Sequence, residues 1–240
     1  MSGGETKVLE RAVETLAQSN ARLLQRVAQL ESRLAEARYL AHHDSLTGLP
    51  NRALLFDRLK QAIPQAERQQ KAVGLLLLDL DGFKAVNDQL GHNMGDLLLQ
   101  QVAARLLGCI RGSDTACRYG GDEFVIMLPE ASGAGAAEAV KQKLRERLSV
   151  PYRLGDHLVA IGASIGAAVF KADARSCAEL IGAADAAMYR AKACSVATVW
   201  RRRTPDGNRD YRDGRERCQP CGNSSVRDSP VNTAYAEGDH

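Results

Sequence analysis

Residues 73–81 read VGLLLLDLD, an almost uninterrupted apolar run that ends in acid. Such a run, without polar residues in alternation, is typical of a strand that is buried on both faces of a central sheet. Apolar residues at helical spacing lie on both sides of it, over residues 51–70 and 83–110. The stretch therefore predicts an α/β protein whose central strand ends in two carboxylates, Asp79 and Asp81.

The residues that follow predict a hairpin and further strands and helices. Residues 115–119 and 124–128 read as short strands around Gly120-Gly121, a tight turn that needs positive φ. The same patterns predict a helix over 134–148, a strand over 159–170 and a helix over 177–193. Strands mixed with helices and one hairpin indicate an α+β sandwich, with a central, mostly antiparallel sheet flanked by helices.

The N-terminal residues 6–41 repeat their apolar side chains in sevens, which predicts a coiled coil. One position of the repeat holds Leu9, Leu16, Leu23, Leu30 and Ala37, and the other holds Val13, Val27 and Leu34. Asn20 falls in the second set, where a buried amide pair favours a two-stranded dimer, and Arg26 can reach Glu31 of a partner. The alternative is a single amphipathic helix that lies on its own domain. We expect residues 1–42 to be a dimerising helix.

Composition excludes several classes of protein. The 240 residues are 45% hydrophobic and 25% charged, which excludes collagen-like, wholly disordered and small disulfide-bonded chains. Charges nearly cancel, with 32 basic and 29 acidic residues, so we expect no general nucleic-acid binding and a local site for any anion. No apolar run approaches the roughly 20 residues of a membrane span, and the first residues do not resemble a signal peptide. We therefore expect a cytoplasmic chain.

Acidic residues follow both the central strand and the hairpin turn. If the hairpin pairs beside that strand, Asp79 and Asp81 meet Asp122 and Glu123 at one end of the sheet. Each acid alone is more often a solvated turn residue, but several hard oxygen ligands together suit Mg²⁺ or Mn²⁺. The short loop that leads to Lys84 offers free amides and a cation for phosphate. Carboxylates, metal and phosphate-binding loop together indicate nucleotidyl transfer.

One segment, residues 118–124, reads RYGGDEF and resembles the signature of the GGDEF family, the diguanylate cyclases that make cyclic di-GMP from two GTP molecules. Further matching segments follow the family's order: DSLTGLPNR at 44–52, DLDGFK at 79–84, ND at 87–88, GH at 91–92, GD at 95–96, ASIG at 163–166 and DAAMYRAK at 185–192. The resemblance covers about residues 43–193. It implies a GGDEF catalytic domain over residues 43–195 with a palm-like nucleotidyl-cyclase fold.

The resemblance also implies roles for individual residues. Asp79, the carbonyl oxygen of Leu80 and Asp122 would bind Mg²⁺ or Mn²⁺, two ions per active site, and Glu123 would accept a proton. Lys84 would join Asp122 and Glu123 in catalysis. The implied substrate contacts are Phe83, Lys84, Asn87, His92, Asp96, Gly120, Gly121 and Lys192. Of these, Asn87 and Asp96 match the positions that read guanine.

Arg111 and Asp114 are separated from Gly120 by the spacing at which the family carries its RxxD product-inhibition site. The resemblance implies that Arg111 engages guanine or phosphate of bound cyclic di-GMP and that Asp114 pairs with guanine. On the residues alone, a surface ion pair near a helix end is the simpler interpretation.

The sequence departs from the family after Lys192. The family continues with Gly-Arg-Asn and a last strand, whereas this chain continues with Ala-Cys-Ser-Val196. With permissible codons, residues 194–200 in another reading frame encode an ending of the family's kind, so we hypothesise a frameshift near Cys194 that the nucleotide sequence would decide. Residues 201–203 are all arginine and offer substitute cations, although a solvated charge run is the commoner case. Over residues 196–240 we expect a last strand and then a disordered tail.

These observations lead to two hypotheses of different classes. The first is a product-inhibited diguanylate cyclase in which a 3′-hydroxyl attacks an α-phosphate between two facing sites, so that a homodimer is required. A regulator acting on the N-terminal end of the coiled coil could then gate activity. The second is a catalytically weak module that binds GTP or cyclic di-GMP and signals through its coiled coil. The acids favour the enzyme, and the altered ending favours the sensor.

Overall fold

The computed structural model describes residues 3–131, 134–193, 199–202 and 211–213 of the chain. Its central sheet has four strands in the order β2–β3–β1–β6, and every neighbouring pair is antiparallel. The strands are β2 (Thr115–Gly120), β3 (Glu123–Ala131), β1 (Ala72–Asp81) and β6 (Gly162–Val169). The predicted hairpin therefore does pair beside the buried strand.

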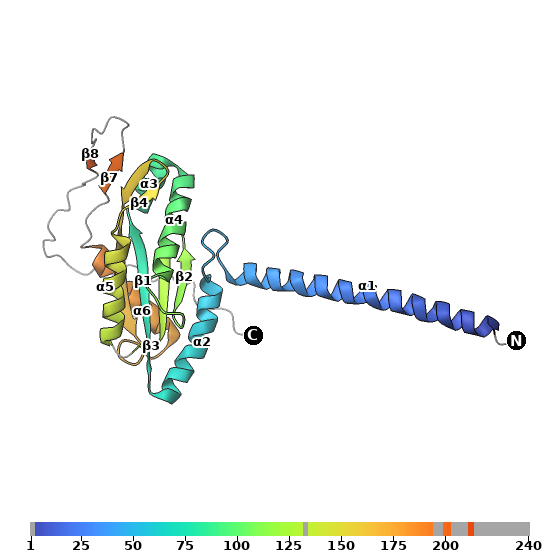
Figure 1. The fold of residues 1–240 in the computed structure, drawn as a ribbon. Coiled ribbons are helices and arrows are strands. Elements are labelled where there is room, and N and C mark those ends of the chain that lie inside the picture. Colours follow the sequence, from blue (N-terminus) through green and yellow to red (C-terminus); the bar gives the residue numbers. More distant parts are fainter. Residues whose placement is uncertain (1–2, 132–133, 194–198, 203–210, 214–240) are drawn as a thin grey trace.

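Helices cover both faces of this sheet (Figure 1). The four helices are α4 (His92–Leu107) and α5 (Ala134–Leu148) on one face, and α2 (Arg52–Gln69) and α6 (Cys177–Lys192) on the other. Because side chains alternate along a strand, β1 sends Leu76 and Leu78 into the first core and Leu75 and Leu77 into the second. The predicted α+β sandwich is confirmed.

Two predicted elements are each divided in the structure. Residues 83–110 form two helices, α3 (Phe83–Leu90) and α4, because Gly91 has a φ of +84° and ends the first helix. Residues 159–170 do not form one strand, since β5 (His157–Ala160) and β6 belong to different sheets. The second, small sheet has the order β4–β5–β7–β8, and its first strand is β4 (Tyr152–Leu154).

The C-terminal residues are described at two short strands, β7 (Val199–Arg202) and β8 (Tyr211–Asp213). A strand is thus present where the last strand was expected, and it pairs with β5. The backbone of β8 pairs with β7, and the disordered tail expected after the last strand stays a prediction. The frameshift hypothesis concerns residues 194–200, of which 194–198 lie outside the described residues.

Helix α1 (Gly3–His42) projects away from the domain (Figure 1). The described apolar side chains of its heptad stripe, each half or more exposed, are Val13, Leu16, Leu23, Val27, Leu30 and Leu34. The alternative of a helix lying on its own domain is therefore wrong. No helix among the described residues is both long enough and apolar enough to cross a membrane.

Candidate active site

Three carboxylates gather at the end of β1. Asp79 is 6% exposed and lies directly opposite Glu123, the first residue of β3, in the sheet register. Asp122 precedes Glu123 in the hairpin turn, so both hairpin acids come to the side of Asp79. The antiparallel pairing of β1 with β3 thus brings together residues that are more than forty positions apart in the sequence.

Two of these acids, Asp122 and Glu123, have a raised pKa. Burial is the first cause of the raised pKa of Asp122, and the charge of Asp79 adds to it. The pKa of Glu123 is likewise raised by burial and then by the charges of Asp79, Asp122 and Asp185. Carboxylates that are close together and partly buried favour a bound cation, because a cation offsets both their repulsion and the cost of burying their charge.

Lys192 is the cation that the chain itself brings to this cluster. Its Nζ lies 2.9 Å from both Oδ1 and Oδ2 of Asp79, and this hydrogen bond raises the pKa of Lys192. Close packing of α6 on β6 places the lysine there: a Cβ at Gly166 would lie 2.1 Å from the Ala184 carbonyl oxygen. The resemblance implied a substrate contact for Lys192; its contact with Asp79 was not predicted.

The donor set fits Mg²⁺ or Mn²⁺ bound together with a phosphate ligand. Asp79 and Asp122 supply carboxylates, and Leu80 can supply only its carbonyl, since its side chain is buried in the core. Among the described residues, no three His, Cys, Asp or Glu side chains are arranged to hold a cation by themselves. Mg²⁺ is commonly held by one or two protein carboxylates, with water and substrate phosphates completing the shell.

The loop after β1 is suited to phosphate. Gly82 has a φ of +82°, and no side chain caps the first amides of α3, which begins at Phe83. Lys84 is exposed on the first turn of this helix. The Ser164 hydroxyl donates to Oδ1 of Asp81 at 2.7 Å. The uncapped amides and Lys84 can therefore meet an anion beside the acids.

A buried acceptor without a partner marks the interface of α3 and α4. The Oδ1 atom of Asn87 has no hydrogen-bond partner among the described residues. Gly95 permits this placement, because a Cβ there would lie 1.9 Å from that oxygen. His92 is exposed at the first residue of α4, and Asp96 is exposed one turn further along the helix. An unpaired buried acceptor is costly, so this position suits a ligand that donates an N–H.

The other predicted residues lie in two turns. Gly120 and Gly121 form the exposed hairpin turn, and Gly121 has a φ of +32°. Arg111 and Asp114 close a turn before β2: the Arg111 amide donates to Asp114 Oδ2 at 2.8 Å. No ion pair joins their side chains in the part of the chain that the structure describes, so the surface ion pair is not formed. This turn lies at the other end of β2 from the hairpin turn.

Sequence reasoning assigned no role to Arg118 or Asp185. Arg118 contacts Asp44 and the carbonyl of Gly121, although it stands inside the motif that signals the family. Asp185 adds negative charge near Glu123. Its seven-residue separation from Lys192 on one helix puts both on one face, and that spacing is a signal which could have found it.

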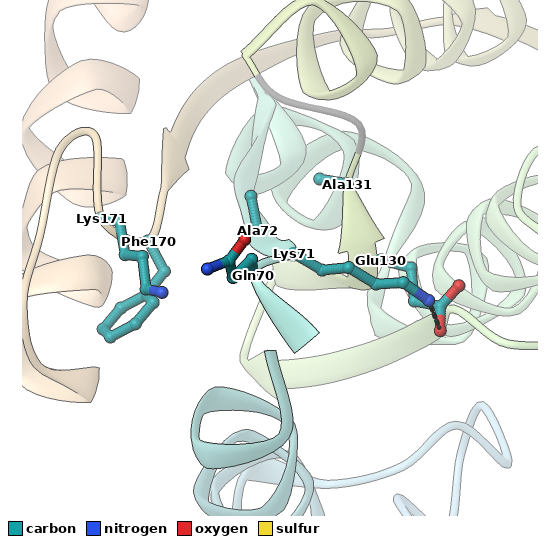
Figure 2. A pocket seen from close by; sticks show the side chains of 7 residues that line it. All are labelled: Gln70, Lys71, Ala72, Glu130, Ala131, Phe170 and Lys171. Atoms are coloured by element: carbon teal, nitrogen blue, oxygen red, sulfur yellow. Dashed lines mark hydrogen bonds and ion pairs between the residues drawn. The ribbon is translucent and has the colours of Figure 1, made fainter. Parts of the chain in front are cut away.

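A cavity of about 440 Å³ lies at the opposite end of β1, next to Ala72 (Figure 2). Lys71 and Glu130 line it and form an ion pair of 2.8 Å. Because β1 runs from Ala72 to Asp81, the length of the sheet separates this cavity from the carboxylates. It is therefore not part of the candidate active site.

Known proteins resemble the chain over the whole folded domain. The family model described as "Diguanylate cyclase, GGDEF domain" matches residues 41–195. The bifunctional diguanylate cyclase/cyclic di-GMP phosphodiesterase MucR of Pseudomonas aeruginosa is 49% identical over 177 residues, covering 72% of this chain and 26% of MucR. The chain thus spans about a quarter of that relative's length.

Two solved structures extend the likeness to the helix. The coiled coil and GGDEF domain of DgcB from Caulobacter crescentus, in complex with c-di-GMP, is 31% identical, with a TM-score of 0.66 over 74% of this chain and 94% of that chain. The diguanylate cyclase SiaD of Pseudomonas aeruginosa, in complex with its activator SiaC, is 30% identical, with a TM-score of 0.62 over 80% of this chain and 75% of that chain.

Proposed function

The chain belongs to the GGDEF family, and from that membership we propose that it is a diguanylate cyclase, which condenses two GTP molecules into cyclic di-GMP and two pyrophosphates. The observation that supports this most is the register that sets Asp79 opposite Glu123, with Asp122 beside them. Three carboxylates next to the uncapped start of α3 suit a metal-bound triphosphate. Because GTP is the substrate, the domain acts in the cytoplasm.

Asp79, the Leu80 carbonyl and Asp122 would hold two divalent cations, Mg²⁺ or Mn²⁺, together with the triphosphate. When bound, these ions neutralise phosphate charge and stabilise the attacking and leaving oxygens. Lys84 and the first amides of α3 contact the phosphates, and Phe83 begins that helix. Lys192, already at the acids, adds a further positive charge. Glycines at the hairpin turn let the polyanion approach the backbone.

Glu123 accepts the proton of the attacking 3′-hydroxyl. A carboxylate is a common proton acceptor, and it acts when it is held within hydrogen-bond reach of the proton that it removes. Its place at the start of β3, opposite Asp79, keeps the base beside the other acids. Orientation of the two nucleotides supplies much of the remaining barrier reduction.

Asn87 and Asp96 read the guanine base. The unpaired Oδ1 of Asn87 accepts an N–H of guanine, and the Asp96 carboxylate accepts from the ring N–H and the exocyclic amine, with His92 nearby. Adenine would leave these acceptors unpaired, which is the kind of mismatch that gives strong discrimination.

A second copy of the chain completes the reaction. Each domain holds one GTP, and pairing of the exposed α1 stripes brings two sites face to face. DgcB, solved with its coiled coil and c-di-GMP, and SiaD, solved with its activator, support a helix that dimerises the domains and receives a regulator. Bound product would inhibit at the turn of Arg111 and Asp114, where the guanidinium is exposed to meet a guanine or phosphate.

A catalytically weak sensor of GTP or cyclic di-GMP is the second candidate, favoured by the departure from Gly-Arg-Asn after Lys192. The test is to strip the purified full chain of bound nucleotide, incubate it with GTP and Mg²⁺, and separate the products. Cyclic di-GMP and pyrophosphate are expected from GTP, and no cyclic product from ATP. Recovery of unchanged GTP, with binding of GTP by calorimetry, would establish the sensor instead.

A further inference from the structure

One side chain joins the start of the domain to the catalytic hairpin. Arg118 Nη1 lies 3.1 Å from both carboxylate oxygens of Asp44, while its Nε and Nη2 donate to the Gly121 carbonyl at 3.0 and 2.8 Å. The two charged side chains are largely buried, at 16% and 22% exposure. The planar fork of a guanidinium can satisfy both partners at once, which an ammonium cannot.

The carbonyl that Arg118 holds belongs to the peptide that joins Gly121 to Asp122. Gly121 has a φ of +32°, so its backbone is not in the extended conformation of a strand. Fixing this peptide plane fixes the direction in which the next residue leaves it. Arg118 thereby orients Asp122. It also orients Glu123, because Glu123 follows Asp122 as the first residue of β3.

Asp44 is itself held firmly. Its Oδ1 accepts from the Thr47 amide at 2.8 Å and from the Thr47 hydroxyl at 2.6 Å. Burial acts to raise the pKa of Asp44, but the hydrogen bonds from Thr47 and Arg118 outweigh it and lower that pKa. Asp44 therefore stays ionised and offers Arg118 a fixed anchor.

The same loop is bonded to the end of α1. Asn51 donates from Nδ2 to the Ala41 carbonyl at 2.8 Å and from its amide to the His42 carbonyl at 2.9 Å. The Arg118 amide in turn donates to the Pro50 carbonyl at 3.0 Å. The last turn of α1, the loop over residues 43–51 and the start of the hairpin therefore form one continuous hydrogen-bonded unit.

We propose that Arg118 is a positioning residue that couples the end of α1 to the turn bearing Asp122 and Glu123. The expected effect on kcat rests on the proposed cyclase function. The structural link between α1 and the hairpin turn does not depend on that function. In this proposal the Arg118–Asp44 pair makes Asp122 and Glu123 move together with α1. A change in the direction of α1 then changes the catalytic hairpin directly, without passing through the core.

The test compares four single variants of the full chain and one double variant, Asp44→Asn with Arg118→Ala. Arg118→Ala removes both contacts, Arg118→Lys keeps the charge near Asp44 but not the fork on Gly121, and Asp44→Asn removes the anchor. Lys71→Ala is the control, because it breaks an ion pair at the opposite end of the sheet. Measurements are kcat and KM for GTP, thermal unfolding, and hydrogen exchange of the amides of residues 119–124.

Positioning predicts that kcat falls about 10- to 100-fold in Arg118→Ala and in Arg118→Lys. The KM for GTP should stay within about threefold, because Lys84, Asn87 and Asp96 lie on α3 and α4 and do not contact Arg118. Asp44→Asn combined with Arg118→Ala should lower kcat no further than Arg118→Ala alone, since both act through one contact. Exchange over residues 119–124 should quicken in both Arg118 variants and not in Lys71→Ala.

A purely stabilising ion pair predicts otherwise. Arg118→Lys would then keep wild-type kcat and wild-type exchange at the turn, and Arg118→Ala would lose activity only in step with its fraction unfolded. Either result overturns the proposal. If the wild-type chain makes no cyclic di-GMP, the proposed function fails, while the exchange measurement still decides whether Arg118 orders the turn.

Discussion

Gly95 controls the placement of Asn87, the residue proposed to read the base, because a Cβ at Gly95 would lie 1.9 Å from Asn87 Oδ1. We expect Gly95→Ala to push the Asn87 amide aside and to raise the KM for GTP about tenfold or more, which is the loss of one hydrogen bond to a base. Steady-state kinetics with GTP measure this change directly.

Gly182→Ala is the matched control, since Gly182 also lies in a helix and a Cβ there meets nothing within 4 Å. It should keep the wild-type KM and leave the stability of the fold unchanged or slightly higher. Equal KM values for Gly95→Ala and wild type would show that Asn87 does not read the base from its position in the structure.

Glu123 should make the metal-free protein less stable at neutral pH. A raised pKa means that folding favours the protonated form, so the stabilisation is present below the ordinary pKa and is lost as pH rises through the raised value. Glu123→Gln should therefore raise the unfolding temperature at pH 7 in chelator, with a smaller gain towards pH 4. Its cyclase activity should fall at least about 100-fold. A stability gain that grows on acidification would contradict this account.

Arg111 presents an exposed guanidinium, because its own backbone amide rather than its side chain binds Asp114. We expect Arg111→Ala to raise the cyclic di-GMP concentration that half-inhibits the enzyme by about tenfold or more, which is the loss of a charge-assisted hydrogen bond. Initial rates at increasing added product measure it. Arg145→Ala, on the exposed face of α5, serves as the control. Identical inhibition curves for Arg111→Ala and wild type would remove Arg111 from the inhibitory site.

Among the elements, α1 is expected to pair with a second copy through its exposed stripe. Leu23→Lys with Leu30→Lys puts charges on that stripe, and the loss of four buried leucines per dimer should weaken dimerisation at least about 10³-fold. The matched control is Gln25→Lys with Ser32→Lys, which adds the same charge on the opposite face of the helix. Sedimentation measures both. A stripe variant that remains dimeric at the wild-type concentration would contradict pairing through α1.

Local sequence patterns predicted the helices and strands in which one pattern of apolar residues continues from the first residue to the last. The nine buried residues of β1 and the helix over 134–148 follow directly from apolar run and helical spacing. The same reasoning failed at Gly91, where a single positive φ separates two helices, and at residues 159–170. There the apolar signal continues while the chain passes from one sheet to another, and sheet membership is a tertiary property.

Predicting the site had a similar limit. Spacing and motif indicated which acids and amides matter, and the hairpin turn implied that Asp122 would reach Asp79. The bond from Lys192 to Asp79 and the link from Arg118 to Asp44 depend on side-chain packing between elements distant in the sequence. No periodicity within one element encodes such contacts, so only the folded chain shows them.

For the whole molecule, the account requires two domains, because each holds one nucleotide and neither can join two by itself. One domain contains the carboxylates, the uncapped start of α3 and the residues proposed to read the base. The exposed stripe of α1 is expected to join two such domains in a dimer. Activity should therefore depend on chain concentration as the dimer forms.

The most direct measurement follows GTP labelled at its α-phosphorus, with Mg²⁺, over a range of concentrations of nucleotide-stripped chain. The account predicts that the label passes into a cyclic dinucleotide with two labelled phosphates per molecule. The rate per chain should rise with concentration until sedimentation shows complete dimer. Label that stays in GTP at concentrations where the chain is dimeric would contradict the account.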